Sequence, residues 1–476
     1  MAGHASGHRR GARRCESRPA HHDDQGTRVG RRRRRAGGAS ARGRADRRRT
    51  PPSHRRHVRH DGAELRPRRR RRARRARRRR LRARGRRVSV VASEPIAPDP
   101  TGVTRSGTGA VRRAGARRRR TPVLVVGVFC GMSLALVALA VVSAGSGQLV
   151  IPPDQVVGAF ARAWNDAVSA AGLGALSVPD GAAMTHVNGE ATLWLIRMPR
   201  LIMAVLVGAT LATAGVVMQG VFRNPLAEPG VIGISSGAAV GASAAIVFGL
   251  TFAGPLTLPL LAFAGGLAAT VIVYSSARAD GRTEVVTLVL TGIAVNAVGG
   301  AAIALFTYLG STQEREQIVF WQLGSLNGTR WQDLAIVAPL AIVGIVACFF
   351  FAGSLDLLAL GERQAEHLGV RVERLRVAAI VVIALLTCAA VAFVGIIGFV
   401  GLVVPHLMRM ILGPAHRLLL PACALGGAVL LLAADLVART AIPGSELPIG
   451  MLTALIGGPF FFWLLRRTRR RSGGWG

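Results

Sequence analysis

The chain has 476 residues, of which 50% are hydrophobic, and a formal net charge of +38. All 62 of its basic residues are arginines, because the sequence contains no lysine. A Walker-type phosphate-binding loop needs a lysine on the nucleotide phosphates, and a Schiff-base enzyme needs a lysine amine. The composition therefore excludes both kinds of site. We expect the chain not to be an enzyme, and any ATP hydrolysis that it requires to take place on another subunit.

The positive charge is concentrated in residues 1–120, which hold 42 of the 62 basic residues and 8 of the 24 acidic ones. Runs such as 31–35 and 68–80 are rich in arginine, and the segment has too few apolar residues to bury a core. We interpret it as a disordered cytoplasmic extension or as sequence upstream of the true start codon. We favour the second interpretation, with Val88 or Val91 as the start. A nucleic-acid-binding arm would carry a folded motif or interleaved aromatic residues, so we expect no nucleic-acid partner.

Cysteine and histidine residues give no sign of a metal site or a disulfide. The five cysteines form no CxxC or CxxH pair, and four of them lie in apolar runs, where cysteine behaves as a small hydrophobic residue. Seven of the eleven histidines lie in residues 1–120, and the others are scattered. We therefore expect no disulfide, no bound metal and no cofactor.

Residues 121–470 predict a membrane domain. A hydrocarbon core of about 30 Å needs roughly 20 apolar residues per helix. Ten apolar runs lie near residues 122–142, 201–221, 231–248, 256–275, 285–309, 334–352, 375–393, 396–412, 418–437 and 447–465. The first run lacks a small-residue cleavage site, so we predict an uncleaved span. The third and eighth runs are short and flanked by glycine and proline, which is typical of broken helices. The fold class is therefore an all-α polytopic membrane protein with ten spans in a lipid bilayer.

The distribution of arginine predicts the orientation. An even number of spans puts both chain ends on one side of the membrane. Basic residues then gather on that side at 117–120, 278–282, 363–376, 416–417 and 466–471. The positive-inside rule makes this side the cytoplasm, so we predict a multi-pass protein of the plasma membrane with both termini cytoplasmic. The longest outer loop, 143–195, contains an amphipathic stretch at 156–168 that we expect to lie along the outer surface.

Small residues recur where helices are expected to touch. They are Gly208, Gly215 and Gly220, the pair Gly237 and Gly241, and Gly395, Gly398 and Gly401. Such residues let backbones approach closely in lipid, so we interpret them as packing positions rather than ligand contacts. Spans two to five and seven to ten each begin with a glycine-rich span and a segment broken by glycine or proline. This pattern favours an inverted duplication.

The segment 222–237, FRNPLAEPGVIGISSG, separates two apolar runs with prolines, glycines and charges. Proline removes a backbone donor and glycine frees the chain, so the preceding helix must end here. Broken backbone at membrane depth is tolerated only inside protein or beside a water-filled path. We therefore predict part of a transport route or its gate, with stabilisation of the break as the alternative role. The candidate residues are Gln219, Arg223, Asn224, Pro225, Glu228 and Pro229.

The loop at 354–370 lies on the predicted cytoplasmic side. Its two glycines, Gly361 and Gly369, are expected to end two short helices with an apolar face and a polar edge. A short helical pair that projects from a membrane domain can fit a groove on a motor subunit. A solvated connector is the alternative.

Few polar residues lie in or beside the apolar runs. Arg197 and Arg439 fall at the outer ends of their spans, where an arginine is usually paired or snorkels. Asp435 is the one acid deep in a span, and we favour its pairing with Arg439, four residues on, over a proton relay. Asn296 is a polar group in an apolar helix and is consistent with hydrogen bonding between helices.

Seven stretches in order along the chain resemble the FecCD family, the permease subunits of iron–siderophore and cobalamin ABC importers. They are IRMPR at 196–200, MQGVFRNPLAEPGVIGISSG at 218–237, LTGIAVN at 290–296, LALGERQAEHLGV at 358–370, GFVGLVVPHLMR at 398–409, ADLVAR at 434–439 and ELPIGMLTALIGGPFF at 446–461. The resemblance covers roughly residues 122–467. It implies the permease architecture of a type II ABC importer, acting as a homodimer or with a paralogous permease. It also implies two ATP-binding subunits and an extracytoplasmic substrate-binding protein as partners.

The resemblance also implies roles for particular residues. Arg197 and Arg439 would meet acidic residues on the two lobes of the binding protein. The loop at 354–370 would be the coupling element seated on the ATP-binding subunits. Its coupling residues would be Leu358, Gly361, Glu362, Ala365, Leu368 and Gly369.

The resemblance also indicates a cargo, and two other functions compete with transport by an ABC importer. Ferric siderophore is the cargo that the resemblance favours, with haem and cobalamin as alternatives. The rival from another class is an ion-coupled secondary transporter, which normally needs more intramembrane carboxylates than Asp435 alone. A membrane-anchored nucleic-acid binder would rest only on the arginine-rich segment.

Overall fold

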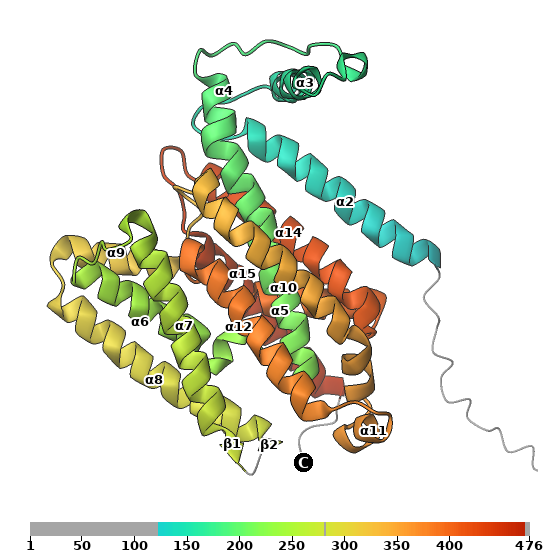
Figure 1. Cartoon of the computed structure of the whole chain (residues 1–476), viewed down its shortest axis with the longest axis vertical. Coiled ribbons are helices and arrows are strands. Elements are labelled where there is room, and N and C mark those ends of the chain that lie inside the picture. The colour runs from blue at the N-terminus through green and yellow to red at the C-terminus, as the bar shows by residue number, and fades with distance from the viewer. Residues whose placement is uncertain (1–121, 280–281, 472–476) are drawn as a thin grey trace, which may run out of the picture. The chain divides into compact units, whose positions relative to one another are not determined.

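The computed structural model describes residues 122–279 and 282–471. The interpretation of residues 1–120 lies outside these ranges. The regular elements of the described residues are helices, apart from one short antiparallel hairpin in which Arg278 pairs with Thr283 and Ala279 with Arg282, and an isolated bridge between Ile442 and Ser445. Figure 1 places α3 at one end of the helical assembly and α11, the hairpin and the C-terminal end at the other.

The helices follow one another along the chain with short connections. They are α2 (Pro122–Gly145), α3 (Pro153–Ala170), η1 (Gly174–Leu176), α4 (Gly189–Ala191), η2 (Thr192–Arg197), α5 (Met198–Val221), η3 (Pro229–Ile232), α6 (Ile234–Val247), η4 (Gly254–Leu256), α7 (Thr257–Ser276), α8 (Val285–Leu309), α9 (Thr312–Leu323), α10 (Trp331–Leu358), α11 (Glu362–His367), α12 (Val372–Val394), α13 (Val400–Leu412), α14 (His416–Thr440) and α15 (Ile449–Arg471). The hairpin consists of β1 (Arg278–Ala279) and β2 (Arg282–Thr283).

The ten predicted spans correspond to ten apolar helices within the described ranges. Seven are long and apolar enough to cross a membrane, and the shorter three are α6, α13 and the apolar part of α15. The prediction that the third and eighth spans are short is thus confirmed. The predicted boundaries of α10 were too narrow, because this helix continues six residues beyond residue 352 to Leu358. The all-α polytopic fold is confirmed.

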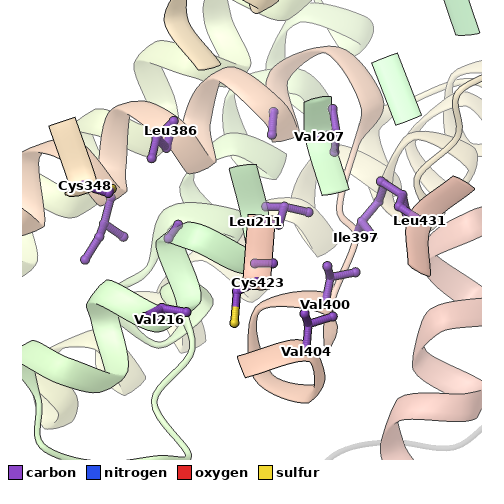
Figure 2. Packing of buried hydrophobic residues seen from close by; sticks show 14 of the residues in the cluster. Val207, Leu211, Val216, Cys348, Leu386, Ile397, Val400, Val404, Cys423 and Leu431 are labelled. Carbon is purple, nitrogen blue, oxygen red and sulfur yellow. The ribbon is translucent and has the colours of Figure 1, made fainter. Parts of the chain in front are cut away.

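The helix α5 forms the centre of the core. Of its apolar stretch 83% is buried inside the protein, against 0% for the peripheral α2. It packs against α10, α12, α13 and α14. Figure 2 shows Val207, Leu211 and Val216 of α5 among apolar side chains of these neighbours. A helix that is apolar on all sides is stable where other helices or lipid surround it, and helices surround α5.

Glycines set the closest helix contacts. A Cβ added at Gly215 would lie 2.0 Å from the carbonyl oxygen of Gly401, and one at Gly208 would lie 2.2 Å from that of Gly427. The helices α6 and α7 approach in the same way at Gly237. The packing interpretation is confirmed at these positions. It is wrong for Gly398, where an added Cβ would meet nothing within 4 Å.

The two predicted repeats share an order of elements. In the first, a break follows the long helix α5 and leads to the short helix α6. In the second, a break follows α12 and leads to the short helix α13. This order agrees with a duplication, while its inversion stays a prediction.

Two of the helices outside the ten apolar helices are α3, which was predicted, and α9, which was not. The amphipathic stretch at 156–168 lies in α3, where Val156 and Ala159 are 1% exposed and Trp164 is 51% exposed. The helix α9 was not predicted. Its capping box of Ser311 and Glu314 was visible in the sequence as S-x-x-E, a pattern typical of helix starts.

The glycine contacts predict a selective loss of stability. Gly215→Ala would place a methyl group against the backbone of α13, so α5 and α13 must separate, at a cost of about 1–3 kcal/mol. We expect a lower melting temperature of the detergent-solubilised protein. Gly131→Ala on α2 is the control, because an added Cβ there meets nothing within 4 Å. Equal melting temperatures for the two variants would contradict this account of the core.

Candidate functional site

The two breaks in the membrane domain lie against each other. A carboxylate oxygen of Glu228, in the break between α5 and α6, accepts a hydrogen bond of 2.9 Å from the backbone N–H of Phe399. Phe399 is the residue directly before α13, so the carboxylate also lies at the positive end of that helix. Pro229 packs close to Gly401 on the first turn of α13. The segment 222–237 is therefore joined to the break before α13.

The backbone of both breaks is strained. Among the described residues, Arg223 and Phe399 are the non-glycine residues with positive φ, at 50° and 67°. Such conformations cost on the order of 1–3 kcal/mol and persist only where surrounding contacts hold them. At Phe399 the contact is the hydrogen bond to Glu228. At the first break, Asn224 accepts a hydrogen bond from the N–H of Leu226, which fixes the turn before the next helix.

Gln219 provides a second connection between the breaks. Its amide donates to the carbonyl of Gly401 over 3.2 Å and accepts from Arg409 over 2.9 Å. Gln219 is buried. It thus links the last turn of α5 to both ends of α13.

The predicted path or gate residues therefore divide into two groups. Gln219, Glu228 and Pro229 contact α13, whereas Arg223, Asn224 and Pro225 are exposed at the turn. For the first group the hydrogen bonds favour stabilisation of the break, which was the alternative role. A contact of any of them with cargo stays a prediction.

Asn296 ties α8 to the first break. Its side chain accepts a hydrogen bond of 2.7 Å from Ser236 and donates to the carbonyl of Gly230 over 3.4 Å. That carbonyl lies in η3, between α5 and α6, and also accepts from the N–H of Gly233 over 3.1 Å. Hydrogen bonding between helices, one of the interpretations of Asn296, is confirmed.

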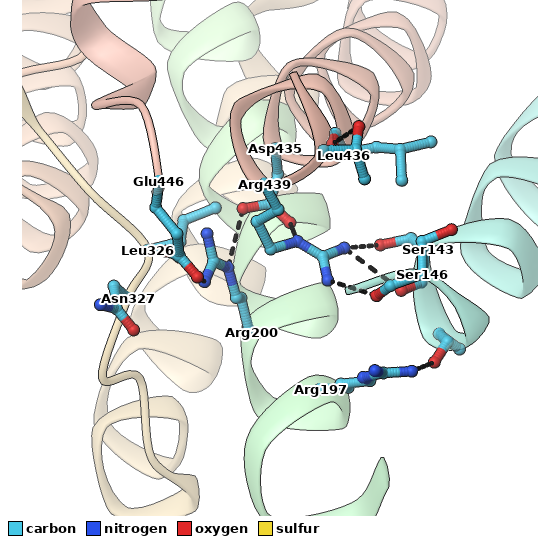
Figure 3. A network of polar contacts seen from close by, with 12 residues as sticks. Ser143, Ser146, Arg197, Arg200, Leu326, Asn327, Asp435, Leu436, Arg439 and Glu446 are labelled. Atoms are coloured by element: carbon cyan, nitrogen blue, oxygen red, sulfur yellow. Dashed lines mark hydrogen bonds and ion pairs between the residues drawn. The ribbon is translucent and has the colours of Figure 1, made fainter. Parts of the chain in front are cut away.

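A network of charges lies at the N-terminal end of α5 and the C-terminal end of α14 (Figure 3). Asp435 has no exposed surface, and its carboxylate accepts from Arg200 at 2.8 Å and from Arg439 at 3.0 Å. Arg200 also pairs with Glu446 at 2.9 Å. The predicted pairing of Asp435 with Arg439 is confirmed. Arg200 was missed as a member of the network, although the motif IRMPR contains it.

The same end of the protein holds the two predicted docking residues. Arg197 is 6% exposed and donates to the carbonyls of Ala144 and Leu149. Arg439 donates to the carbonyl of Ser146 over 3.0 Å in addition to Asp435. Both guanidinium groups therefore hold the chain that follows α2. Their burial weighs against direct contact with a partner protein, and their docking role stays a prediction.

The loop predicted at 354–370 contains one short helix rather than two. Residues 354–358 are the last turn of α10, and α11 follows after Gly361, which has a φ of 125°. The expectation of a first separate helix was wrong because the apolar pattern of α10 continues without a break to Leu358. Gly369, with a φ of 89°, ends α11 as expected.

The predicted coupling residues have different exposures. Leu358 and Ala365 are 1% and 0% exposed and seat α11 on the helices behind it, and Gly361 is also buried. Leu368 is 58% exposed, although it is a large apolar side chain. Glu362 is partly exposed and pairs with Arg376 at 2.8 Å. The loop thus presents an apolar side chain beside charged groups at the inner end.

Comparison with known proteins identifies the family that shares this architecture. The model of the FecCD transport family matches residues 135–467. The chain is 43% identical over 320 residues to the hemin transport system permease protein of Yersinia pestis, covering 65% of this chain and 94% of that protein. It is 44% identical over 277 residues to the cobalamin import system permease protein of Halobacterium salinarum, covering 58% and 74%.

The chain is also similar to a permease named for an iron chelate and to a transporter of solved structure. The chain is 43% identical over 273 residues to the Fe(3+) dicitrate transport system permease protein of Escherichia coli, covering 57% of this chain and 84% of that protein. A solved transporter, described as of metal-chelate ABC type and inward-facing, covers 72% of this chain and 99% of its own length, with 33% identity and a TM-score of 0.60. The chain therefore belongs to the FecCD transport family and is the membrane-spanning permease subunit of an ABC importer, not its ATPase.

Proposed function

We propose that this permease moves a ferric siderophore from an extracytoplasmic binding protein into the cytoplasm, driven by two separate ATP-binding subunits. The observation that carries the proposal is the likeness to permeases named for hemin, ferric dicitrate and cobalamin. All three names describe bulky metal chelates, and two of the three chelates contain iron. Haem and cobalamin are the competing cargoes. The secondary-transporter alternative loses its support, because Asp435 is paired with two arginines.

We infer that two permeases, identical or paralogous, assemble side by side. Apolar side chains that a single chain leaves uncovered support this, since Val298 on α8 and Leu455 on α15 are 71% and 70% exposed. Lipid covers whatever part of these faces the second copy does not.

We also propose that the end carrying α11 faces the cytoplasm. Exposed arginines at this end support the orientation, among them Arg278 before the hairpin tip, Arg363 on α11 and Arg417 at the start of α14. In this orientation α11 reaches the ATP-binding subunits, with Leu368 available for an apolar groove. Displacement of α11 by those subunits would then alternate the access of the path.

The cargo is tested by uptake into proteoliposomes that contain the permease, the ATP-binding subunit and the binding protein encoded with it. We expect ATP-dependent uptake of a ferric siderophore, and little uptake of haem or cobalamin at equal concentration. Uptake of haem or cobalamin instead would reassign the cargo. Uptake driven by an ion gradient without ATP or binding protein would overturn the importer function itself.

Coupling through α11 predicts an uncoupled variant. Gly369→Val forces a β-branched residue into a φ of 89°, where nothing lies within 4 Å of the added Cβ. The end of α11 must then shift to relieve a strain on the order of 1–3 kcal/mol. We expect less uptake per ATP hydrolysed, measured in proteoliposomes.

Gly413→Val is the matched control for this experiment. Gly413 has a φ of 95°, again with nothing within 4 Å, and lies in the loop between α13 and α14. It therefore carries a similar backbone strain outside the coupling loop. Equal uptake per ATP in the two variants would remove the segment 354–370 from the mechanism.

Docking through Arg197 and Arg439 predicts a loss of affinity for the binding protein. We propose that both act through the outer loop that they hold. Arg439→Gln keeps an amide donor near Ser146 but removes the positive charge. A glutamate at this position would instead be repelled by the buried carboxylate of Asp435. We expect binding of cargo-loaded binding protein to weaken about tenfold, which is about 1.4 kcal/mol.

The measurement uses the permease in nanodiscs, with Arg197→Gln as the second variant. Arg417→Gln is the control, because Arg417 is exposed at the other end of the protein. A lower melting temperature with unchanged affinity would show that Arg197 and Arg439 serve stability alone.

A further inference from the structure

A buried arginine joins three segments at the inner end of the protein. Arg376 lies on the second turn of α12 and is 5% exposed. Its guanidinium group donates to a carboxylate oxygen of Glu362 on α11 over 2.8 Å. It also donates to the backbone carbonyl of Thr283 over 2.9 Å and to Glu373 over 3.3 Å. One side chain thus contacts the proposed coupling helix, the β1–β2 hairpin and the base of α12.

The hairpin is bound to α12 by further hydrogen bonds. The backbone N–H of Thr283 donates to Glu373 over 3.2 Å, and its hydroxyl donates to the other oxygen of the same carboxylate. Thr283 is 4% exposed and ends β2, two residues before α8 begins at Val285. The N–H of Glu284 donates to the carbonyl of Ala277 over 3.2 Å, which closes the base of the hairpin.

The chemistry of this cluster favours movement as a unit. A guanidinium group is planar and permanently charged, and it presents several donors in fixed directions. Separating Arg376 from Glu362 would leave a buried positive charge without one of its two carboxylate partners, which is unfavourable in a low-dielectric environment. Among the described residues of the hairpin, no other group accepts a hydrogen bond from the hydroxyl of Thr283. The cluster is therefore more resistant to opening than the exposed loop around it.

We propose that Arg376 is a positioning residue that ties the inner end of the α7–α8 pair to α11, so that a displacement of α11 also displaces this pair. The proposal rests on the coupling role proposed above for α11. It extends that role, because α8 carries Asn296, which donates to the carbonyl of Gly230 in the first break. Motion of α11 therefore reaches the broken segment through Arg376, the hairpin and α8.

The test measures uptake per ATP hydrolysed by the assembled transporter in proteoliposomes. We expect Arg376→Gln to lower this ratio about fivefold while ATP hydrolysis continues, since coupling changes of this size accompany the loss of one connecting contact. Arg374→Gln is the matched control, because Arg374 is exposed two residues before Arg376 on α12. A merely structural role would lower the melting temperature and the yield of the assembled complex without changing the ratio.

A second variant keeps the test valid if Arg376→Gln does not fold. Thr283→Val has nearly the same shape, removes only the hydroxyl bond to Glu373 and leaves the ion pairs of Arg376 intact. We expect a smaller decrease in the same ratio.

A distance measurement follows the motion directly. Spin labels are placed at Glu366 on α11 and Arg278 on the hairpin, which are both exposed. Cys130→Ser removes the exposed thiol among the described residues, and Cys15→Ser removes the thiol outside them. We expect the distance between the labels to be the same with and without a nonhydrolysable ATP analogue in the parent. It should change with nucleotide in Arg376→Gln or Thr283→Val.

The outcomes distinguish this inference from the proposed function. If Gly369→Val uncouples transport while Arg376→Gln and Thr283→Val behave as Arg374→Gln does, α11 couples by another route and the role of Arg376 is overturned. If Gly369→Val also has no effect, the coupling role of α11 fails and the inference fails with it. A label distance that varies with nucleotide in the parent would likewise overturn the rigid connection.

Discussion

Hydrogen bonding of broken backbone inside a hydrocarbon environment is the constraint on which this structure depends. A helix interrupted at membrane depth leaves N–H and C=O groups that lipid cannot satisfy. Here side chains from the first break and from the helix before it satisfy backbone groups at the second break, through Glu228 on the N–H of Phe399 and through Gln219 on the carbonyl of Gly401. The two breaks are therefore in direct contact.

The charged clusters extend the same principle to the two ends of the protein. At the end that carries α3, Asp435 pairs with two arginines, and those arginines hold the chain after α2 and the loop before α15. At the end that carries α11, Arg376 pairs with two carboxylates and donates to a backbone carbonyl. In both cases a group that is costly to bury fixes segments that are distant in sequence. The helical core between the ends is held mainly by close glycine contacts and apolar packing around α5.

The sequence predicted the helices well because their signals are local. Apolar runs, the prolines and glycines of 222–237 and the spacing of Asp435 from Arg439 all lie within a few residues of one another. The contacts that the sequence could not reveal join distant residues. The partners of Arg197 are Ala144 and Leu149, and those of Arg376 include Thr283 and Glu362. No local sequence pattern predicts these contacts. The capping box of α9 was local and could have been found.

The charged cluster around Asp435 has a consequence for the effect of mutations. Arg200, Arg439, Asp435 and Glu446 together carry two positive and two negative charges, so the group is neutral as a whole. Loss of a single member leaves an uncompensated charge at a site where Asp435 has no exposed surface. Substitution of a single member therefore lowers stability, most of all at Asp435, which pairs with two arginines. The four positions, which lie up to 246 residues apart, depend on one another for charge balance.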